Sequence, residues 1–291
     1  MIVSFHPVIE GDQNILCAGR APDTTDLAAI QSAGAVLLPQ GCPEALYRMA
    51  RTHCAHVFPN LDTRFDYPGK RGQIRLFQEL GVAHPPTASY ADVAAFQQSR
   101  PALNWPAVIK YDWGGQGETV FKITNDQELA QILNRATAFE ASGQKGFLIQ
   151  QFIPTKNRSL RVARIGTRVI SYWRIQSVTA QFGTSVTYGA RIDHDANPAL
   201  KAAGEAVVQT FCVRTGLQLA GFDFIFDNRS LAQERVEPLL LEINYFFGRT
   251  GLGGSEAYYR LLIEEVDRWL SRLGLSRPGK RLKSGGRVEA G

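Results

Sequence analysis

The sequence lacks most features of membrane-spanning, secreted and zinc-dependent proteins. No apolar run approaches the roughly 20 residues that a transmembrane helix needs. Met1–Pro7 has neither the basic start nor the long apolar segment of a signal peptide. The four cysteines form no CxxC pair, and the five histidines form no helical pair with a carboxylate. We therefore expect a cytoplasmic protein without membrane contact, with reduced thiols and without zinc-hydrolase chemistry.

Charge is also sparse outside the C-terminal end. The formal net charge of the chain is +5, and residues 277–291 hold five basic residues and one acid, a net of +4. The rest of the chain therefore carries only +1. We expect residues 276–291 to form a flexible basic tail, solvated rather than bound. A nucleic-acid-binding tail is the less favoured alternative, and its affinity would fall steeply with salt.

The first 66 residues show short apolar runs that alternate with helical patterns. Helices are predicted to begin at Asp23 and Pro43. The intervening strands are predicted at Met1–Phe5, Asn14–Cys17, Ala35–Leu38 and His56–Phe58. This alternation predicts a small α/β unit with a largely parallel sheet. It contains no GxGxxG loop, so nothing indicates a dinucleotide site in it.

Two strand-like runs near the C-terminal end carry an unusual set of polar residues. In Pro238–Asn244 side chains alternate between two faces, so Leu241 and Ile243 are expected to point into the core. The run Gly221–Phe226 has one acid at its centre. If the runs pair as a hairpin, three hard oxygen donors suited to Mg²⁺ converge: Asp223, Glu242 and Asn244. The alternative is that each is the polar member of a half-buried strand.

A second polar pattern lies between residues 68 and 123. Lys70 begins a helix predicted to reach Leu80, and Lys110 ends a strand that starts at Trp105. A glycine-rich turn and a strand at Glu118–Ile123 follow. The turn glycines are Gly114, Gly115 and Gly117. They would let backbone N–H groups approach phosphate oxygens while the lysine supplies a charge, although a plain hairpin turn is the alternative.

The rest of the chain alternates strands and helices. Helices are predicted at Asn125–Glu140, Asn197–Thr215 and Ser255–Leu273. Strands are predicted at Phe147–Pro154, Ser159–Ile165 and Arg168–Gln176. Arg161 and Arg174 lie on two of these strands, with a spacing that lets both face one cleft. The Gly-, Thr- and Ser-rich segment from Ser177 to Ala190 indicates a mobile loop.

In this order the features resemble the ATP-grasp superfamily, and most closely its branch of ribosomal-protein glutamate ligases and glutathione synthetases. The resemblance covers about Asp66 to Leu273, and the Asp223…Glu242-x-Asn244 pattern is its most specific part. It implies an α/β (α+β) ATP-grasp fold with a small Rossmann-like domain in front. The implied divisions are an N-terminal domain at 1–66, an ATP-grasp domain at 67–275 and a lid within it at about 90–153.

The resemblance also implies a role for each matching residue. Those on the nucleotide phosphates would be Lys70 and Lys110, under a lid formed by Gly114, Gly115 and Gly117. Those on the adenine would be Gln151, Phe152 and Ile153. Two catalytic cations would hold the transferring phosphoryl group or a substrate carboxylate, namely Arg161 and Arg174. One or two Mg²⁺ ions, or Mn²⁺, would be bound by Asp223, Glu242 and Asn244.

The implied activity is an ADP-forming ligase that joins a carboxylate to an amine through an acylphosphate. Its substrates would be small molecules or peptides, and a homodimer is the default assembly. Such chemistry needs no protein nucleophile, because positioning and electrostatic stabilisation carry the rate. The alternative is a non-catalytic regulatory module of the same fold that binds Mg-ATP and releases no ADP.

The sequence departs from the family pattern at several positions. Gln150-Gln151 stands where the family usually has Gln-Glu, and Ser159 occupies the place of an acid that grips the ribose. Residues 182–186 lack the Arg-Ser-Asn pattern of glutamate ligases. Phe246-Phe247 replaces a small segment after the metal-binding asparagine. These departures leave the acceptor substrate open and predict a changed ribose contact and a reshaped acceptor pocket.

Overall fold

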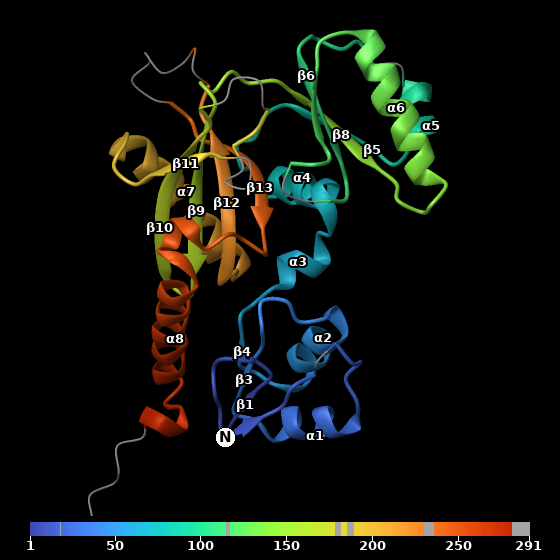
Figure 1. Ribbon diagram of the computed structural model, residues 1–291. Helices are drawn as coiled ribbons and strands as arrows, with labels where there is room; N and C mark the ends of the chain where they lie inside the picture. The colour runs from blue at the N-terminus through green and yellow to red at the C-terminus, as the bar shows by residue number, and fades with distance from the viewer. Residues whose placement is uncertain are drawn as a thin grey trace, which may run out of the picture.

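The computed structural model describes residues 1–17, 19–99, 101–114, 117–177, 182–184, 189–227, 229 and 236–280. Three separate sheets organise these residues, as Figure 1 shows, with the N-terminal sheet at one end and the helices at Val93–Ser99 and Asp126–Glu140 at the other. Within the described residues, no helix combines the length and the apolar composition that crossing a bilayer requires. The predicted basic tail lies mostly outside these residues, although Arg277 pairs with Asp267 at 2.7 Å.

The N-terminal sheet has the order β2-β1-β3-β4, and its described pairs are all parallel. Its strands are β1 (Ile2–Ser4), β2 (Gln13–Asn14), β3 (Ala35–Leu37) and β4 (Val57–Phe58). Its helices are α1 (Thr24–Ser32) and α2 (Glu44–His53). The predicted parallel α/β unit is therefore confirmed, and Asp23 caps α1 in a capping box with Asp26. The strand expected at Asn14–Cys17 was wrong, because only Gln13 and Asn14 pair with β1.

A five-stranded antiparallel sheet with the order β11-β10-β9-β12-β13 forms the centre of the molecule. The strands are β9 (Arg158–Ile165), β10 (Arg168–Ile175), β11 (Arg191–Asp193), β12 (Leu219–Ile225) and β13 (Leu239–Asn244). Helix α7 (Pro198–Thr215) packs with Val162 and Phe222 on one face. Helix α8 (Gly254–Arg272) packs with Ala163 and Leu219. Because neighbouring residues of a strand point to opposite faces, the two helices cover opposite sides.

The third sheet has the order β5-β8-β6-β7. Its strands are β5 (Thr87–Tyr90), β6 (Ala107–Tyr111), β7 (Val120–Ile123) and β8 (Phe147–Gln151). Helices α5 (Val93–Ser99) and α6 (Asp126–Glu140) pack on it with a separate apolar core. Two more helices, α3 (Asp62–Asp66) and α4 (Gly69–Glu79), connect the N-terminal sheet to this lid (Figure 1). Short 3-10 turns lie at Thr250–Leu252 and Pro278–Lys280.

One apolar core joins the N-terminal unit to the central sheet. Val3 and Val36 of the first sheet belong to the same buried cluster as Val208 of α7 and Phe222 of β12. Polar contacts add to it, since the N–H of Asn60 donates to Oε1 of Gln218 at 2.8 Å. The predicted boundaries at residues 66 and 275 stay predictions.

A β-bulge in the central hairpin changes one predicted orientation. Asp223 pairs with Glu242, but Phe224 pairs with Leu240. The register therefore shifts, and Leu241 has no paired residue on β12. Leu240 is consequently fully buried, whereas Leu241 is half-buried and lines a cavity. The expectation that Leu241 points into the core was therefore wrong, because a bulge inserts one residue into the alternation. Ile243 is buried as predicted.

Candidate functional site

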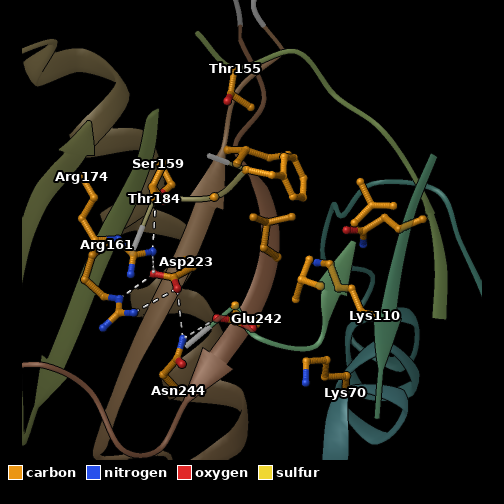
Figure 2. Close-up of a pocket in the computed structure, with 18 of the residues that line it drawn as sticks. Lys70, Lys110, Thr155, Ser159, Arg161, Arg174, Thr184, Asp223, Glu242 and Asn244 are labelled. Carbon is orange, nitrogen blue, oxygen red and sulfur yellow. Dashed lines mark hydrogen bonds and ion pairs between the residues drawn. The ribbon is translucent and has the colours of Figure 1, made fainter. Parts of the chain in front are cut away.

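A cavity of about 910 Å³ lies between the central sheet and the lid. It gathers all twelve of the predicted site residues that the structure describes, and Gly115 lies outside the described residues. Figure 2 shows the two walls: the acids and arginines stand on the central sheet, and the two lysines face them from the lid side. The sequence pattern therefore identified one common location, although the residues come from segments as far apart as 70 and 244.

The predicted hairpin brings the three oxygen donors together. Strands β12 and β13 pair antiparallel, with Asp223 opposite Glu242 and Gly221 opposite Asn244. Nδ2 of Asn244 donates to Oδ2 of Asp223 at 3.1 Å and to Oε1 of Glu242 at 3.2 Å. The NH2 group of the Asn244 amide thus bridges two carboxylates at the point where the sequence predicts a cation.

Asp223 is the most heavily coordinated acid of the cavity. Nε and Nη2 of Arg161 donate to its two oxygens at 2.5 and 3.0 Å, and Nη2 of Arg174 lies 2.7 Å from Oδ1. Asp223 is only 3% exposed. Burial alone would raise its pKa, but the charges of Arg161 and Arg174 outweigh burial and hold the pKa far below its ordinary value. The carboxylate therefore stays ionised throughout the neutral range.

The donor set fits a hard divalent cation. Carboxylate and amide oxygens are the ligands that Mg²⁺ prefers, and each oxygen of Asp223 already accepts two donors. The donor from Asn244 is the one that a cation can replace, because rotation of the amide turns its oxygen toward the same point. Among the described residues, no group of three or more His, Cys, Asp or Glu side chains gathers. The site instead combines two acids with an amide.

The two lysines have a different environment from the arginines. Lys110, on β6, is 7% exposed, and burial lowers its pKa to about 8 against the opposing attraction of Glu242. Burial also lowers the pKa of Lys70, whose Nζ donates to the carbonyls of Trp113 and Gly114 at 3.0 and 3.1 Å. No described carboxylate forms a salt bridge with either lysine. Their charges therefore remain available to an anion.

The charges of the cavity sum to a positive value. Three acids line it, namely Asp112, Asp223 and Glu242. Six cations line it as well, namely Lys70, Lys110, Lys122, Arg158, Arg161 and Arg174. The excess of three positive charges favours a polyanion over a neutral molecule.

The lid tip is built against the start of α4. Gly69 has φ of 71°, and a Cβ there would lie 2.5 Å from Oδ1 of Asp112, so only glycine fits. The same Asp112 oxygen accepts the N–H of Arg71 at 2.8 Å. Gly114 also has a positive φ, of 77°, and lies against Thr119. These contacts fix the hairpin that follows Lys110 over the cavity.

The predicted adenine-binding segment forms the far end of the cavity. Ile153 is buried and Phe152 half-buried, with Nζ of Lys122 4.3 Å from the Phe152 ring centre. The N–H of Gln151 donates to the carbonyl of Pro86 at 2.9 Å. That donor is therefore already used within the protein, and Phe152 and Ile153 contribute apolar lining to the cavity.

Ser159, at the family's ribose-acid position, belongs to the arginine network. Its hydroxyl lies 2.5 Å from that of Thr184 and accepts from Nη2 of Arg174 at 3.1 Å. Nε of Arg174 is buried and has no hydrogen-bond partner among the described residues. Ser159 thus orients an arginine of the cavity.

The sequence did not reveal Gln73, which aligns the metal-binding strand. Its side-chain amide donates to the carbonyl of Ile243 at 2.9 Å and accepts the N–H of Ile243 at 2.8 Å. Ile243 lies between Glu242 and Asn244 on an edge strand, so this pair of bonds imitates a further strand. A glutamine on a helix gives no local signal for such a role, because its partner is 170 residues away.

Tyr172 was also missed, and it shapes the cavity beside the arginines. Its ring packs directly on the backbone of Gly251, where a Cβ would lie 2.2 Å from the ring. Burial raises the pKa of Tyr172, so its hydroxyl stays protonated at neutral pH. Most of the predicted mobile loop, from Ser177 to Ala190, lies outside the described residues.

Comparison with known proteins agrees with this geometry. The family described as RimK-like ATP-grasp domain matches residues 74–255, which is more than half of the chain. A search of curated proteins finds no match.

Three solved structures illustrate the similarity of fold. A RimK domain protein ATP-grasp from Sphaerobacter thermophilus DSM 20745 has a TM-score of 0.62 and 15% identity, over 91% of this chain and 98% of that one. The D-cycloserine synthetase DcsG has a TM-score of 0.59 and 15% identity, over 92% and 99%. The ADP complex of purK, N5-carboxyaminoimidazole ribonucleotide synthetase, has a TM-score of 0.59 and 11% identity over 86% of this chain, which spans 64% of its length. At these identities the similarity establishes the fold alone.

Proposed function

The chain belongs to the RimK-like ATP-grasp family, and from this premise we propose that it is a ligase that uses Mg-ATP to join a carboxylate to an amine. The observation that carries the proposal is the arrangement of charge across one cavity. Two acids and an amide meet on the central sheet, opposite buried Lys110 and half-buried Lys70, neither of which has a salt-bridge partner among the described residues. A nucleoside triphosphate with bound metal is a ligand that satisfies both walls at once.

The proposed reaction has two steps. A carboxylate oxygen of the substrate attacks the γ-phosphorus of ATP, the bond to the β-phosphate oxygen breaks, and ADP leaves. The amine nitrogen then attacks the carbonyl carbon of the acylphosphate, the C–O bond to phosphate breaks, and the amine proton is lost to solvent. The products are the amide, ADP and inorganic phosphate. Bound Mg²⁺ would neutralise charge between the β- and γ-phosphates.

The residues of this chain would position the reactants. Asp223, Glu242 and Asn244 would hold one or two Mg²⁺ ions, and Gln73 fixes the strand that carries two of them. Lys70 and Lys110 would bind the phosphates, while Phe152 would pack on the adenine. Arg161 and Arg174 are held by Asp223, so we assign them first to orienting that ligand and second to charge developing on the transferred group.

One observation favours the non-catalytic alternative. The position where the family grips ribose with an acid holds Ser159, whose hydroxyl contacts Arg174 and Thr184. A module that binds Mg-ATP without turnover would tolerate weaker contacts to the ribose hydroxyls. The reported family match concerns the domain and leaves the substrates open, and the homodimer and the cytoplasmic location stay predictions.

The deciding experiment measures ADP release from Mg-ATP with pools of amino acids, dipeptides and polyamines. We expect release that requires both an acid and an amine, and loss of at least about 100-fold in Glu242→Gln. Glu242 is the better probe than Asp223, because it has no arginine partner among the described residues, so its removal breaks no buried ion pair with an arginine. Binding of Mg-ATP without ADP release from any pool would establish the non-catalytic alternative.

A further inference from the structure

A second, smaller cavity of about 400 Å³ opens beside the metal-binding strand. It shares five lining residues with the large cavity, among them Asn244, Gln73 and Phe246. Arg64 and Tyr245 line the small cavity and not the large one. The two spaces therefore meet at Asn244, and the smaller one extends toward the segment that joins the N-terminal sheet to α4. Its volume suits a group about the size of one amino acid.

Arg64 is held rigidly on one side. Its Nη1 donates to the carbonyls of Gln40 and Cys42 at 3.0 and 3.3 Å. Its guanidinium carbon lies 4.7 Å from the ring centre of Phe65 and 4.9 Å from that of Phe246. The guanidinium is thus fixed by two carbonyls and two rings, so little conformational freedom remains to be lost when a ligand binds.

The other edge of the same guanidinium has no protein partner among the described residues. Neither Nε nor Nη2 of Arg64 takes part in a hydrogen bond or an ion pair there. The acids around this position are committed elsewhere, since Glu44 and Asp66 both pair with Arg48 and Asp62 pairs with Arg51. The Nε–Nη2 edge has the fork geometry that binds a carboxylate through two parallel hydrogen bonds.

The contrast with the large cavity shows that this edge is unusual. Arg161 uses the equivalent edge, Nε and Nη2, to hold both oxygens of Asp223. Arg64 presents the same fork, half-buried and without an ion pair among the described residues, although Glu44 attracts it from farther away. Burial lowers its pKa, which reflects the cost of keeping an unpaired charge in such a place. An external anion would remove that cost.

We propose that Arg64 binds a carboxylate of the substrate that does not itself react, so that one of the two substrates is an amino acid or a short peptide with a free carboxylate. This inference rests on the proposed ligase function. The reacting carboxylate has to reach the phosphates, beside Lys110 and Glu242, in the large cavity. A carboxylate at Arg64 would be a second one, on the other side of Asn244, with Phe246 against the adjoining apolar part of the ligand.

The test pairs each of a panel of L-amino acids and dipeptides with its C-terminal amide. Binding is measured by thermal shift in the presence of Mg²⁺ and a non-hydrolysable ATP analogue, and turnover by ADP release. We expect at least one acid to bind the wild type about 10- to 100-fold more tightly than its amide, because a bidentate charged contact is lost. Arg64→Gln should lose this discrimination while its affinity for Mg-ATP stays within about twofold.

Arg75→Gln is the matched control. Arg75 also stacks on a ring, that of Tyr67 at 4.9 Å, but it is exposed and lines neither cavity. It should keep the wild-type discrimination. Arg64→Lys retains the charge without the fork and should lose most of the preference for the acid. If Arg64→Gln does not fold, the proposal is tested by the preference of Arg64→Lys for the acid over the amide.

The outcomes separate this inference from the proposed function. Discrimination between acid and amide without ADP release would overturn the ligase and leave the Arg64 site standing. ADP release with equal preference in wild type and Arg64→Gln would overturn the Arg64 site and leave the ligase. If no compound of the panel binds better as the acid than as the amide, the Arg64 inference is wrong.

Discussion

The two walls of the large cavity hold their positive charges in opposite ways. On the central sheet, Arg161 and Arg174 both form ion pairs with Asp223 within the protein. On the lid side, Lys110 and Lys70 have no described salt-bridge partner, and burial lowers the pKa of both. The first wall therefore has its ion pairs in the folded chain, whereas the second has none among the described residues and can form them with a ligand. The comparison teaches that similar cations in one cavity can serve stability and binding separately.

The strongest challenge to this comparison is to remove the acid of the first wall. Asp223→Asn keeps the size of the side chain but leaves two arginines without a counter-charge. We expect the free energy of unfolding to fall by about 3–5 kcal/mol, as when one partner of a buried ion pair is removed. Urea denaturation measures this change.

Asp227→Asn is a suitable control, because Asp227 pairs with Arg229 at the surface of the same hairpin. Its effect should be much smaller. If Asp223→Asn were as stable as the control, the buried arginines would not depend on Asp223, and the description of this wall as self-contained would be wrong.

The opposite result is expected on the lid wall. Lys110→Met removes a buried ammonium that has no described carboxylate partner, so the fold should be as stable as the wild type or more stable. Binding of Mg-ATP should weaken about 10- to 100-fold, because a charged phosphate contact is lost. Isothermal titration calorimetry checks the affinity and thermal unfolding checks the stability.

Lys145→Met provides the comparison, since Lys145 is an exposed lid residue outside the cavity. It should leave the affinity unchanged. Equal affinity of Lys110→Met and the wild type for Mg-ATP would refute a phosphate-binding role for Lys110.

The pH dependence sharpens the same contrast. Lys110 has a folded pKa of about 8, below the value of about 10.4 of an unfolded lysine, so its contribution to stability rises between these values. Asp223 has a depressed pKa, so its contribution is present above about pH 4 and is lost as the pH falls. Mg-ATP affinity should fall about tenfold per unit above pH 8, because the free protein has to take up a proton.

Titrations from about pH 7 to 10 with the wild type and Lys110→Met test this expectation. The variant should show little pH dependence in this range, although it keeps Lys70. A parallel decline in both proteins would mean that another group titrates.

The smallest effect is expected at the adenine end, where the side chain that is removed carries no charge. Phe152→Ala removes a half-buried ring that faces the cavity and carries Lys122 at 4.3 Å. We expect Mg-ATP to bind about tenfold more weakly, from the lost apolar contact alone. Phe139→Ala, at an exposed lid position outside the cavity, is the control. The affinity for AMP, measured by competition, should differ between the wild type and Phe152→Ala by the same factor, because the lost contact is to the adenine and not to the phosphates.

Much of this architecture follows from local sequence patterns. Alternation in Gly221–Phe226 and Pro238–Asn244 predicted the hairpin, and Asn125 and Gly216 mark helix ends as expected. The described members of the predicted site meet in one cavity because their types and order are those of a known family.

The remainder depends on contacts that no local pattern records. The bulge beside Asp223 reversed the orientation of Leu241, since an inserted residue leaves no sequence signal of its own. The short helices α3 and α5 and the strand β11 were missed because each spans few residues. Gln73 and Arg64 gained their roles from partners far away in sequence. The pairing of Arg161 with Asp223 likewise depends on the neighbouring strands β9 and β12.

The apolar cluster shared by the first sheet and the central sheet limits how the chain can be divided. A fragment starting after residue 66 would expose to water the side of the cluster that Val3 and Val36 now cover. It would also lose Arg64 from the small cavity and the hydroxyl contact from Tyr245 to Thr63. Exchanging the first sheet for that of a relative would therefore change both the cooperativity of thermal unfolding and the choice of ligand. A chimaera of this protein has to keep the N-terminal unit together with the central-sheet residues that it contacts.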